Sequence, residues 1–207
     1  MSNNLSFFHN NIVPLTNKQK RKLKRVNTGL RLREIEPMTK TQERVFNSYY
    51  SGKNIMCHGV AGTGKTFIAT YLATQEVLSN YNDTRSLHII RSVVPTRDMG
   101  FLPGNQREKS KVYEAPYYAI FTELFERGDA YEILKGREQV HFTTTSFIRG
   151  LTINDAVVIV DECQNMTYHE LDSIITRLGE NCKIIFCGDF RQSDFRFQDE
   201  RNGVIEF

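Results

Sequence analysis

Short apolar runs and amphipathic stretches alternate along most of the chain. The runs are almost uniformly hydrophobic, which is typical of strands that are buried on both faces of a parallel sheet. Parallel strands need crossover connections, so the alternation predicts an α/β fold with three layers and a mostly parallel sheet. Strands are expected at residues 54–57, 87–90, 140–143, 156–160 and 183–187.

Helices are predicted where apolar residues recur every three or four positions. After the first strand, the residues with this spacing are Phe67, Ile68, Tyr71, Leu72 and Leu78. Thr167 and Glu170 form the pattern of a capping box, which marks the start of a later helix. Residues 92–107 hold three turn-prone sites and are expected to form a loop. The expected helices cover residues 39–50, 66–79, 108–127 with a break at Pro116, and 167–178.

The N-terminal residues differ from the rest in charge. Between positions 18 and 33 there are eight basic residues and no acidic one. Since the whole chain carries +3, residues 34–207 carry a net charge of −5. A basic arm on an acidic body suggests an anionic partner, RNA or single-stranded DNA first, although a solvated tail has the same pattern. We expect a weakly structured arm over residues 1–36 and one domain over residues 37–207.

The stretch from Gly59 to Thr66 matches the pattern G-x-x-x-x-G-K-[ST] at every position. It lies between a predicted strand and a predicted helix, the context in which this pattern forms a phosphate-binding loop. There the glycines let backbone amides surround a phosphate, the lysine contacts the terminal phosphates, and the last hydroxyl binds Mg²⁺. We predict ATP and Mg²⁺ as cofactors, with the nucleotide in contact with Gly59, Val60, Ala61, Gly62, Thr63, Gly64, Lys65, Thr66 and Phe67.

The fourth apolar run ends in two adjacent carboxylates, Asp161 and Glu162. Ligands of open α/β sheets bind at the carboxyl ends of the strands, which is where these acids are expected. Asp161 would join Thr66 in holding Mg²⁺, and Glu162 would orient or deprotonate an attacking water. Two adjacent acids suit hydrolysis better than transfer to an acceptor hydroxyl. The competing interpretation is a solvated loop after a core strand.

Two glutamines are further candidates for the nucleotide site. Gln192 follows the last predicted strand, where a glutamine could sense the γ-phosphate and couple hydrolysis to motion. Gln42 could select ATP through the edge of adenine. Thr39 and Gln42 also fit a capping box, so a purely local role for Gln42 stays open.

These motifs together resemble the first RecA-like domain of superfamily 1 helicases. The chain more closely resembles the PhoH family of phosphate-starvation-type P-loop ATPases, in the short form carried by bacteriophages. The resemblance covers roughly residues 37–195 and rests on Phe101-Leu102-Pro103-Gly104, Glu108-Lys109, residues 147–156, residues 161–167 and residues 176–179. Cys163 replaces the usual alanine of the acidic motif, and the family normally continues into a further strand and helix beyond the last residues of this chain.

The resemblance implies an ATP-binding RecA-like domain with ATPase activity and a suspected role on RNA. It implies that Gln42 contacts adenine and that the catalytic set includes Lys65, Glu162, Gln192, Arg149 and Arg177. One of the two arginines would act on the ATP of a neighbouring subunit, because a single RecA-like domain has no second domain to supply an arginine. A surface salt bridge is the rival role for each. By analogy we expect a homo-oligomer, with a ring as one form.

Two other function classes stay open. A lone RecA-like domain without its arginine would be a nucleotide-gated binding module with little turnover. A P-loop kinase would need several lid arginines, which Arg91, Arg97 and Arg107 could supply. The acid pair and the terminal glutamine favour hydrolysis over the kinase.

Targeting signals and metal-binding cysteine patterns are not found in the sequence. No apolar run reaches the roughly 18 residues of a membrane span, and the N-terminus does not have the pattern of a secretion signal. The four cysteines form no C-x-x-C pair. We therefore expect a cytoplasmic protein, in the host cytoplasm if it comes from a bacteriophage, with buried thiols and no membrane partner.

Overall fold

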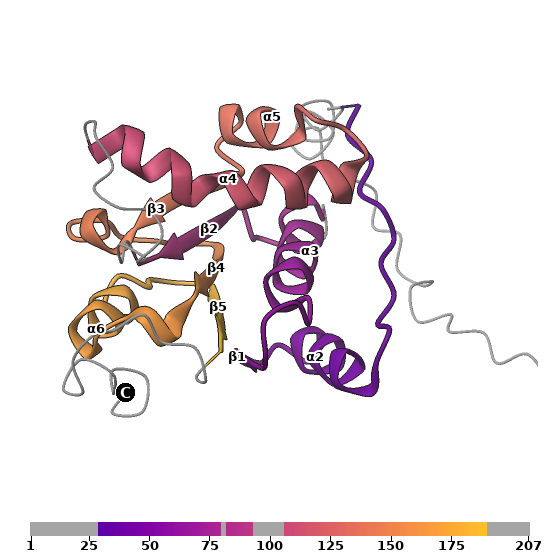
Figure 1. The fold of residues 1–207 in the computed structure, drawn as a ribbon, viewed down its shortest axis with the longest axis horizontal. Coiled ribbons are helices and arrows are strands. Elements are labelled where there is room, and N and C mark those ends of the chain that lie inside the picture. The colour runs from indigo at the N-terminus through magenta and orange to yellow at the C-terminus, as the bar shows by residue number, and fades with distance from the viewer. Residues whose placement is uncertain (1–28, 80–81, 93–105, 190–207) are drawn as a thin grey trace, which may run out of the picture. The chain divides into compact units, whose positions relative to one another are not determined.

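The computed structural model describes residues 29–79, 82–92 and 106–189 of the 207-residue chain (Figure 1). A compact unit begins at Arg31 and contains the whole sheet. Residues 1–28 of the predicted arm, most of the predicted loop and Gln192 lie outside the described residues. Within the described ranges, no helix is both long enough and apolar enough to cross a membrane.

In the described part of the chain, five parallel strands form one sheet, in the order β1-β5-β4-β2-β3. This confirms the predicted α/β fold. Every predicted strand is present, with small differences at the ends. The strands are β1 (Ile55–His58), β2 (Ser86–Arg91), β3 (Val140–Thr144), β4 (Ala156–Asp161) and β5 (Cys182–Gly188).

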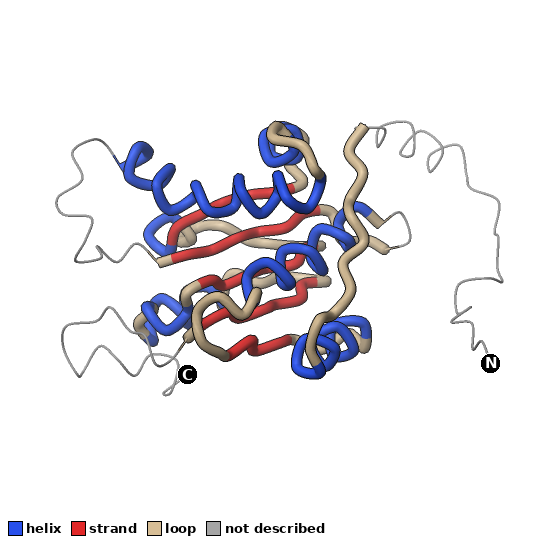
Figure 2. The backbone as a smooth tube through the Cα atoms, turned by 45° about the vertical axis from the view of Figure 1, so that its right-hand side comes forward, coloured by secondary structure: helices blue, strands red, loops and turns tan. Residues whose placement is uncertain are grey.

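Helices cover both faces of the sheet, and Figure 1 shows α3 and α6 on opposite sides of it. The central strand β4 is buried at all six positions, as expected for a strand between two helical layers. Figure 2 shows the helices running alongside the strands in a second view. The helices are α2 (Lys40–Tyr50), α3 (Lys65–Leu78), α4 (Gln106–Phe125), α5 (Ala130–Gly136) and α6 (Tyr168–Ile175), with short 3₁₀ turns at η1 (Thr145–Phe147) and η2 (Cys163–Asn165).

Two sequence-based expectations for the helices need correction, and one helix was not expected. Pro116 does not break α4, which continues through it to Phe125. Pro116 removes the hydrogen bond to the carbonyl of Val112, and both residues are exposed, so water can satisfy that carbonyl. The helix that begins after Thr167 ends at Ile175 rather than at residue 178. The short helix α5 had no prediction at all.

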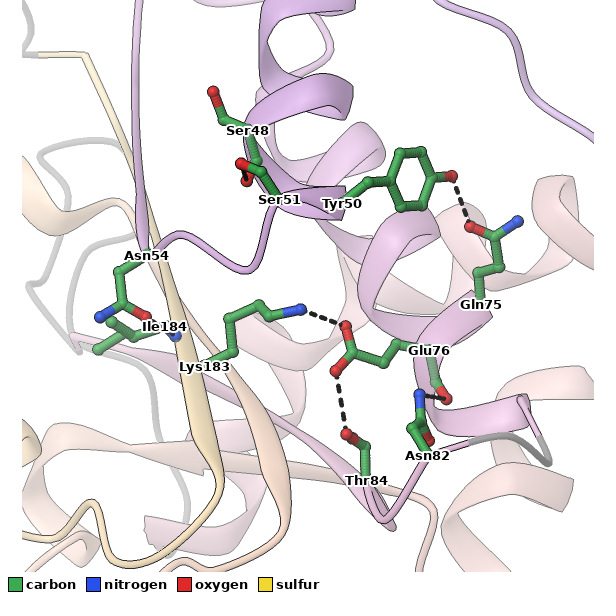
Figure 3. Close-up of polar contacts among 10 residues, drawn as sticks. All are labelled: Ser48, Tyr50, Ser51, Asn54, Gln75, Glu76, Asn82, Thr84, Lys183 and Ile184. Atoms are coloured by element: carbon green, nitrogen blue, oxygen red, sulfur yellow. Dashed lines mark hydrogen bonds and ion pairs between the residues drawn. The ribbon is translucent and has the colours of Figure 1, made fainter. Parts of the chain in front are cut away.

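The far end of α3 is tied to β5 by an ion pair (Figure 3). Lys183 Nζ lies 2.7 Å from Glu76 Oε2, and Thr84 Oγ1 donates to Glu76 Oε1 at 3.0 Å. The Lys183 ammonium also lies 4.0 Å from the centre of the Tyr49 ring, a cation–π contact. Burial by itself raises the pKa of Glu76. Its hydrogen bonds, with Lys183 first among them, and the charge of Lys183 have a larger effect, so the pKa of Glu76 is lowered overall. The Glu76 carboxylate therefore stays charged at neutral pH, and its contacts fix the C-terminal end of α3.

Two histidines stack across the β2–β3 edge of the sheet. The rings of His88 and His141 are 4.5 Å apart, and the two residues are paired in register. Burial, helped by the charge of His141, lowers the pKa of His88 to about 4. An unfolded chain takes up this proton near pH 6.5, whereas the folded chain resists it down to about pH 4.

We therefore expect the fold to lose stability as the pH falls from about 6.5 towards 4. Replacing His88 by glutamine removes this proton uptake. Between pH 7 and pH 5, the free energy of unfolding should therefore fall by about 1 kcal/mol less in His88→Gln than in the native chain. This figure includes a reduction for solvent screening, because His88 is only partly buried. Urea unfolding at the two pH values measures this, with exposed His169→Gln as the control. Equal pH dependence in all three proteins would contradict the assignment.

Candidate functional site

The loop between β1 and α3 has the backbone shape that a phosphate-binding loop needs. Gly62 and Gly64 have φ angles of 78° and 79°, a left-handed conformation that glycine adopts without strain. Gly64 is also the N-cap of α3, so the loop leads directly into the amino end of that helix. The unpaired amides and the dipole of a helix start together favour an anion.

Lys65 lies folded over this loop. Its Nζ donates to the carbonyl oxygens of Gly59 at 2.7 Å and Val60 at 2.9 Å. Thr63 Oγ1 donates to the same Val60 carbonyl at 2.9 Å, which tightens the turn. The ammonium group is therefore held at the mouth of the loop, on contacts that an incoming phosphate can replace.

A hydrogen bond joins the loop to the end of the central strand. Thr66 Oγ1 donates to Asp161 Oδ1 at 2.7 Å, although the two residues are 95 positions apart in the chain. Two hard oxygen ligands therefore lie side by side at the carboxyl edge of the sheet. Such a pair suits Mg²⁺, which is commonly bound by one or two protein oxygens together with substrate phosphates and water.

The second oxygen of Asp161 has a partner that the sequence motifs did not identify. The hydroxyl of Tyr117, on α4, donates to Asp161 Oδ2 at 2.7 Å. Tyr117 is 0% exposed and Asp161 is 4% exposed. The aromatic residues Tyr113, Tyr117, Phe121 and Phe125 recur at helical spacing along α4 and are buried. That spacing gives no sign of a contact with Asp161.

Glu162 follows β4 in a left-handed conformation, with φ at 53°. Its carboxylate Oε2 accepts a hydrogen bond from Gln164 Nε2 at 2.6 Å. Gln164 Oε1 in turn accepts from the backbone N–H of Asp189, at 3.1 Å. Gln164 thus links the acid pair to the end of β5 and fixes the direction of the Glu162 carboxylate.

The end of β5 packs against this segment too closely for any residue larger than glycine. A Cβ added at Gly188 would lie 2.7 Å from Cys163 Sγ and 3.0 Å from Gln164 Oε1. Cys163 is fully buried, as expected for the residue in the alanine position. Gly188 therefore lets β4 and β5 bring their polar ends together.

These elements enclose a cavity of about 250 Å³ at the carboxyl edge of the sheet. A hydrogen bond with Cys57 raises the pKa of the Cys187 thiol at its base, and burial raises that pKa further, so Cys187 stays neutral. The predicted loop and acid residues meet here. The cavity is lined by Ala61, Gly62, Gly64, Lys65, Thr66, Phe67, Asp161, Glu162, Cys187 and Gly188.

Gln42 contacts the loop from the side of α2. Its Nε2 donates to the carbonyl of Thr63 at 3.4 Å, and its Oε1 accepts from the N–H of Met38 at 2.7 Å. Its own N–H is capped by Thr39 Oγ1 at 3.2 Å. The backbone N–H of Gln42 thus takes part in the N-cap of α2, and its side chain lies beside the phosphate loop. Contact with adenine stays a prediction.

The two predicted arginines lie apart from the cavity. Arg149 is exposed after η1, and Arg177 lies in the turn after α6. The Arg177 carbonyl accepts from the N–H of Ile153, before the start of β4, which places it at the amino edge of the sheet. Neither is among the residues that line the cavity, and a catalytic role for either one stays a prediction.

Comparison with known proteins gives a consistent result. Residues 34–207 match the family model described as PhoH-like protein. The chain is 36% identical over 155 residues to Protein PhoH2 of Bacillus subtilis, covering 72% of this chain and 34% of that protein. It is 38% identical over 139 residues to a PhoH-like protein of Synechocystis (67% and 42%) and 32% identical over 169 residues to Protein PhoH of Escherichia coli (74% and 47%).

The chain spans less than half the length of each of these relatives. The family match nevertheless includes the phosphate loop, the acid pair and the end of β5. This chain therefore belongs to the PhoH-like protein family, a family of P-loop ATPase type.

Proposed function

We propose that this protein hydrolyses ATP with Mg²⁺ and does so in contact with RNA or single-stranded DNA. The observation that carries the ATPase proposal is the hydrogen bond between Thr66 and Asp161, because it joins the phosphate loop to the acid-bearing strand in one cavity. A glycine-rich turn without function has no reason to hold its hydroxyl against a buried carboxylate.

Each part of the site has a role in this chemistry. The loop amides and Lys65 would bind the phosphates, and Thr66 and Asp161 would hold Mg²⁺ together with the nucleotide. The metal would neutralise charge that develops on the phosphate oxygens.

Glu162 is the proposed base for the attacking water. It lines the same cavity as Lys65 and is held by Gln164, so its carboxylate has one preferred direction. A general base must lie within hydrogen-bond reach of the proton it takes, which this placement at the cavity wall allows. Gln192 would add a contact to the terminal phosphate.

The nucleic-acid part of the proposal rests on charge. Eight basic residues between positions 18 and 33 precede a domain of net charge −5. Such an arm would bind a phosphate backbone with little sequence preference and with a strong dependence on salt.

ATP hydrolysis measured with and without single-stranded RNA tests both parts. We expect a Mg²⁺-dependent rate that increases with RNA in the native chain. Replacing Lys20, Arg21, Lys22 and Lys24 by glutamine should abolish that increase and leave the basal rate unchanged. The slope of log affinity for RNA against log salt should become shallower by about 0.7 for each phosphate that the arm no longer neutralises. If RNA does not change the ATPase rate, and RNA affinity depends on salt equally in the native chain and the variant, the coupling to nucleic acid is disproved. The ATPase part of the proposal would then still stand.

A nucleotide-gated module with little turnover is the second candidate. It is favoured by the position of Arg149 and Arg177 away from the cavity, because catalysis would then need an arginine from another chain. The two candidates differ in how the specific rate depends on protein concentration. A specific rate that is constant upon dilution supports the self-sufficient ATPase, whereas one that falls upon dilution supports activation by a second copy.

A further inference from the structure

Asp161 is held from two sides, and only one of them belongs to the phosphate-loop and acid motifs. Thr66 from the phosphate loop occupies Oδ1, and Tyr117 from α4 occupies Oδ2, each at 2.7 Å. The Tyr117 contact is buried, so water does not compete for it. A carboxylate with a donor on each oxygen cannot rotate without breaking a hydrogen bond.

Tyr117 acts as a donor at any physiological pH. Burial raises the pKa of its hydroxyl well above the usual value, and the charge of Asp161 raises it further, while Arg91 partly opposes this. The proton therefore stays on the tyrosine oxygen and points to Asp161. The hydrogen bond therefore runs from Tyr117 to Asp161.

The ring of Tyr117 is itself fixed by its neighbours. It packs against Phe142 of β3, with ring centres 5.5 Å apart. One turn earlier on the same helix, Tyr113 lies under the guanidinium of Arg91, 6.0 Å from the ring centre. Arg91 is the register partner of Asp161 on the neighbouring strand. Helix α4 thus contacts the ends of β2 and β4 through two tyrosines on one face.

We propose that Tyr117 is a positioning residue for magnesium: its hydroxyl holds Oδ2 of Asp161 so that Oδ1 stays turned to Thr66 and to the metal. This inference rests on the proposed function, because it takes Thr66 and Asp161 as the residues that hold Mg²⁺ with the nucleotide. It adds α4, which carries none of the phosphate-loop motifs, to the metal site.

Removal of the hydroxyl changes one atom and keeps the ring. In Tyr117→Phe the oxygen Oδ2 has no partner in a buried place, and the carboxylate has a reason to turn or to take up water. Groups that orient metal ligands typically change metal affinity by about 10- to 100-fold when they are removed. We therefore expect the Mg²⁺ concentration for half-maximal binding of ADP to rise roughly 10-fold. Binding of ADP without Mg²⁺ should not change.

Tyr131→Phe is the matched control. The Tyr131 hydroxyl donates to a buried carboxylate oxygen, Glu114 Oε1, at 2.7 Å, and Tyr131 is 1% exposed. The same atom is removed from another buried tyrosine–carboxylate pair, but this pair joins α4 to α5 rather than to the cavity. Lys135 Nζ also lies 2.6 Å from Glu114 Oε1, so the stability of both variants is measured by urea unfolding beside the metal titration.

The experiment titrates Mg²⁺ into the full chain with a fluorescent ADP, and repeats the titration with Mn²⁺ followed by electron paramagnetic resonance. A metal shift in Tyr117→Phe but not in Tyr131→Phe supports the inference. Equal titrations in both variants and the native chain overturn it and leave the proposed function intact. Absence of metal-dependent ADP binding in the native chain overturns both.

Discussion

Lys65→Ala should reduce ATP hydrolysis by on the order of 100- to 1000-fold. The ammonium group is held over the loop by the Gly59 and Val60 carbonyls, at the amino end of α3. In the ATP complex it would exchange these contacts for phosphate oxygens, where charge develops during hydrolysis. Removing one preorganised donor from such a place typically raises the barrier by about 3–4 kcal/mol.

The effect on binding should be smaller than the effect on rate. The loop amides and the dipole of α3 remain in Lys65→Ala, and they continue to attract the phosphates. Steady-state hydrolysis and calorimetric ATP titration separate the two quantities. Lys53→Ala removes an exposed lysine two residues before β1 and is the control for a general change in charge. A Lys65→Ala protein with the native rate would refute the assignment of this loop.

Glu162→Gln should lower the rate by about 100- to 10,000-fold and leave ATP bound. Glutamine keeps the size of the side chain but cannot accept a proton, and general bases contribute about this much to a rate. Glutamine can still keep a hydrogen bond with Gln164, which in the native chain lies 2.6 Å from the carboxylate. Loss of the negative charge near the phosphates should, if anything, strengthen ATP binding.

A single-turnover measurement is the right test, because it reports the chemical step. Glu123→Gln, at an exposed position of α4, removes the same charge far from the proposed chemistry. If Glu162→Gln hydrolyses ATP at the native single-turnover rate, the base must be another group, and Asp189, directly after β5, is the next to test.

The sequence predicted the central strand β4 best, because its apolar residues alone show that it is buried. The run from Ala156 to Val160 is apolar throughout, and all of it is buried in β4. Local rules failed where long-range packing decided the outcome. Pro116 predicts a helix break, but neighbouring aromatic residues of α4, Tyr113 and Tyr117 among them, are buried and carry the helix through it.

In the candidate site, too, local patterns were predicted from the sequence and long-range contacts were not. The pattern from Gly59 to Thr66 and the acid pair are local, and the structure places residues of both along one cavity. The bond between Tyr117 and Asp161 joins residues 44 positions apart, and no periodicity encodes it. The left-handed backbone of Glu162 is likewise unexpected for a glutamate, and it follows from the tight turn after β4.

Helix α3 is anchored at both of its ends. Thr66 ties its first turn to β4, and Glu76 ties its last turn to β5 (Figure 3). A helix held in this way can neither slide nor tilt without breaking a partly buried polar contact. Among the described residues next to α3, we therefore expect adjustment to the proposed nucleotide in the segment from Gly59 to Gly64, with the helix itself fixed. Slow amide exchange along α3 and fast exchange in that loop are the signature of such a division between a rigid rod and an adaptable loop.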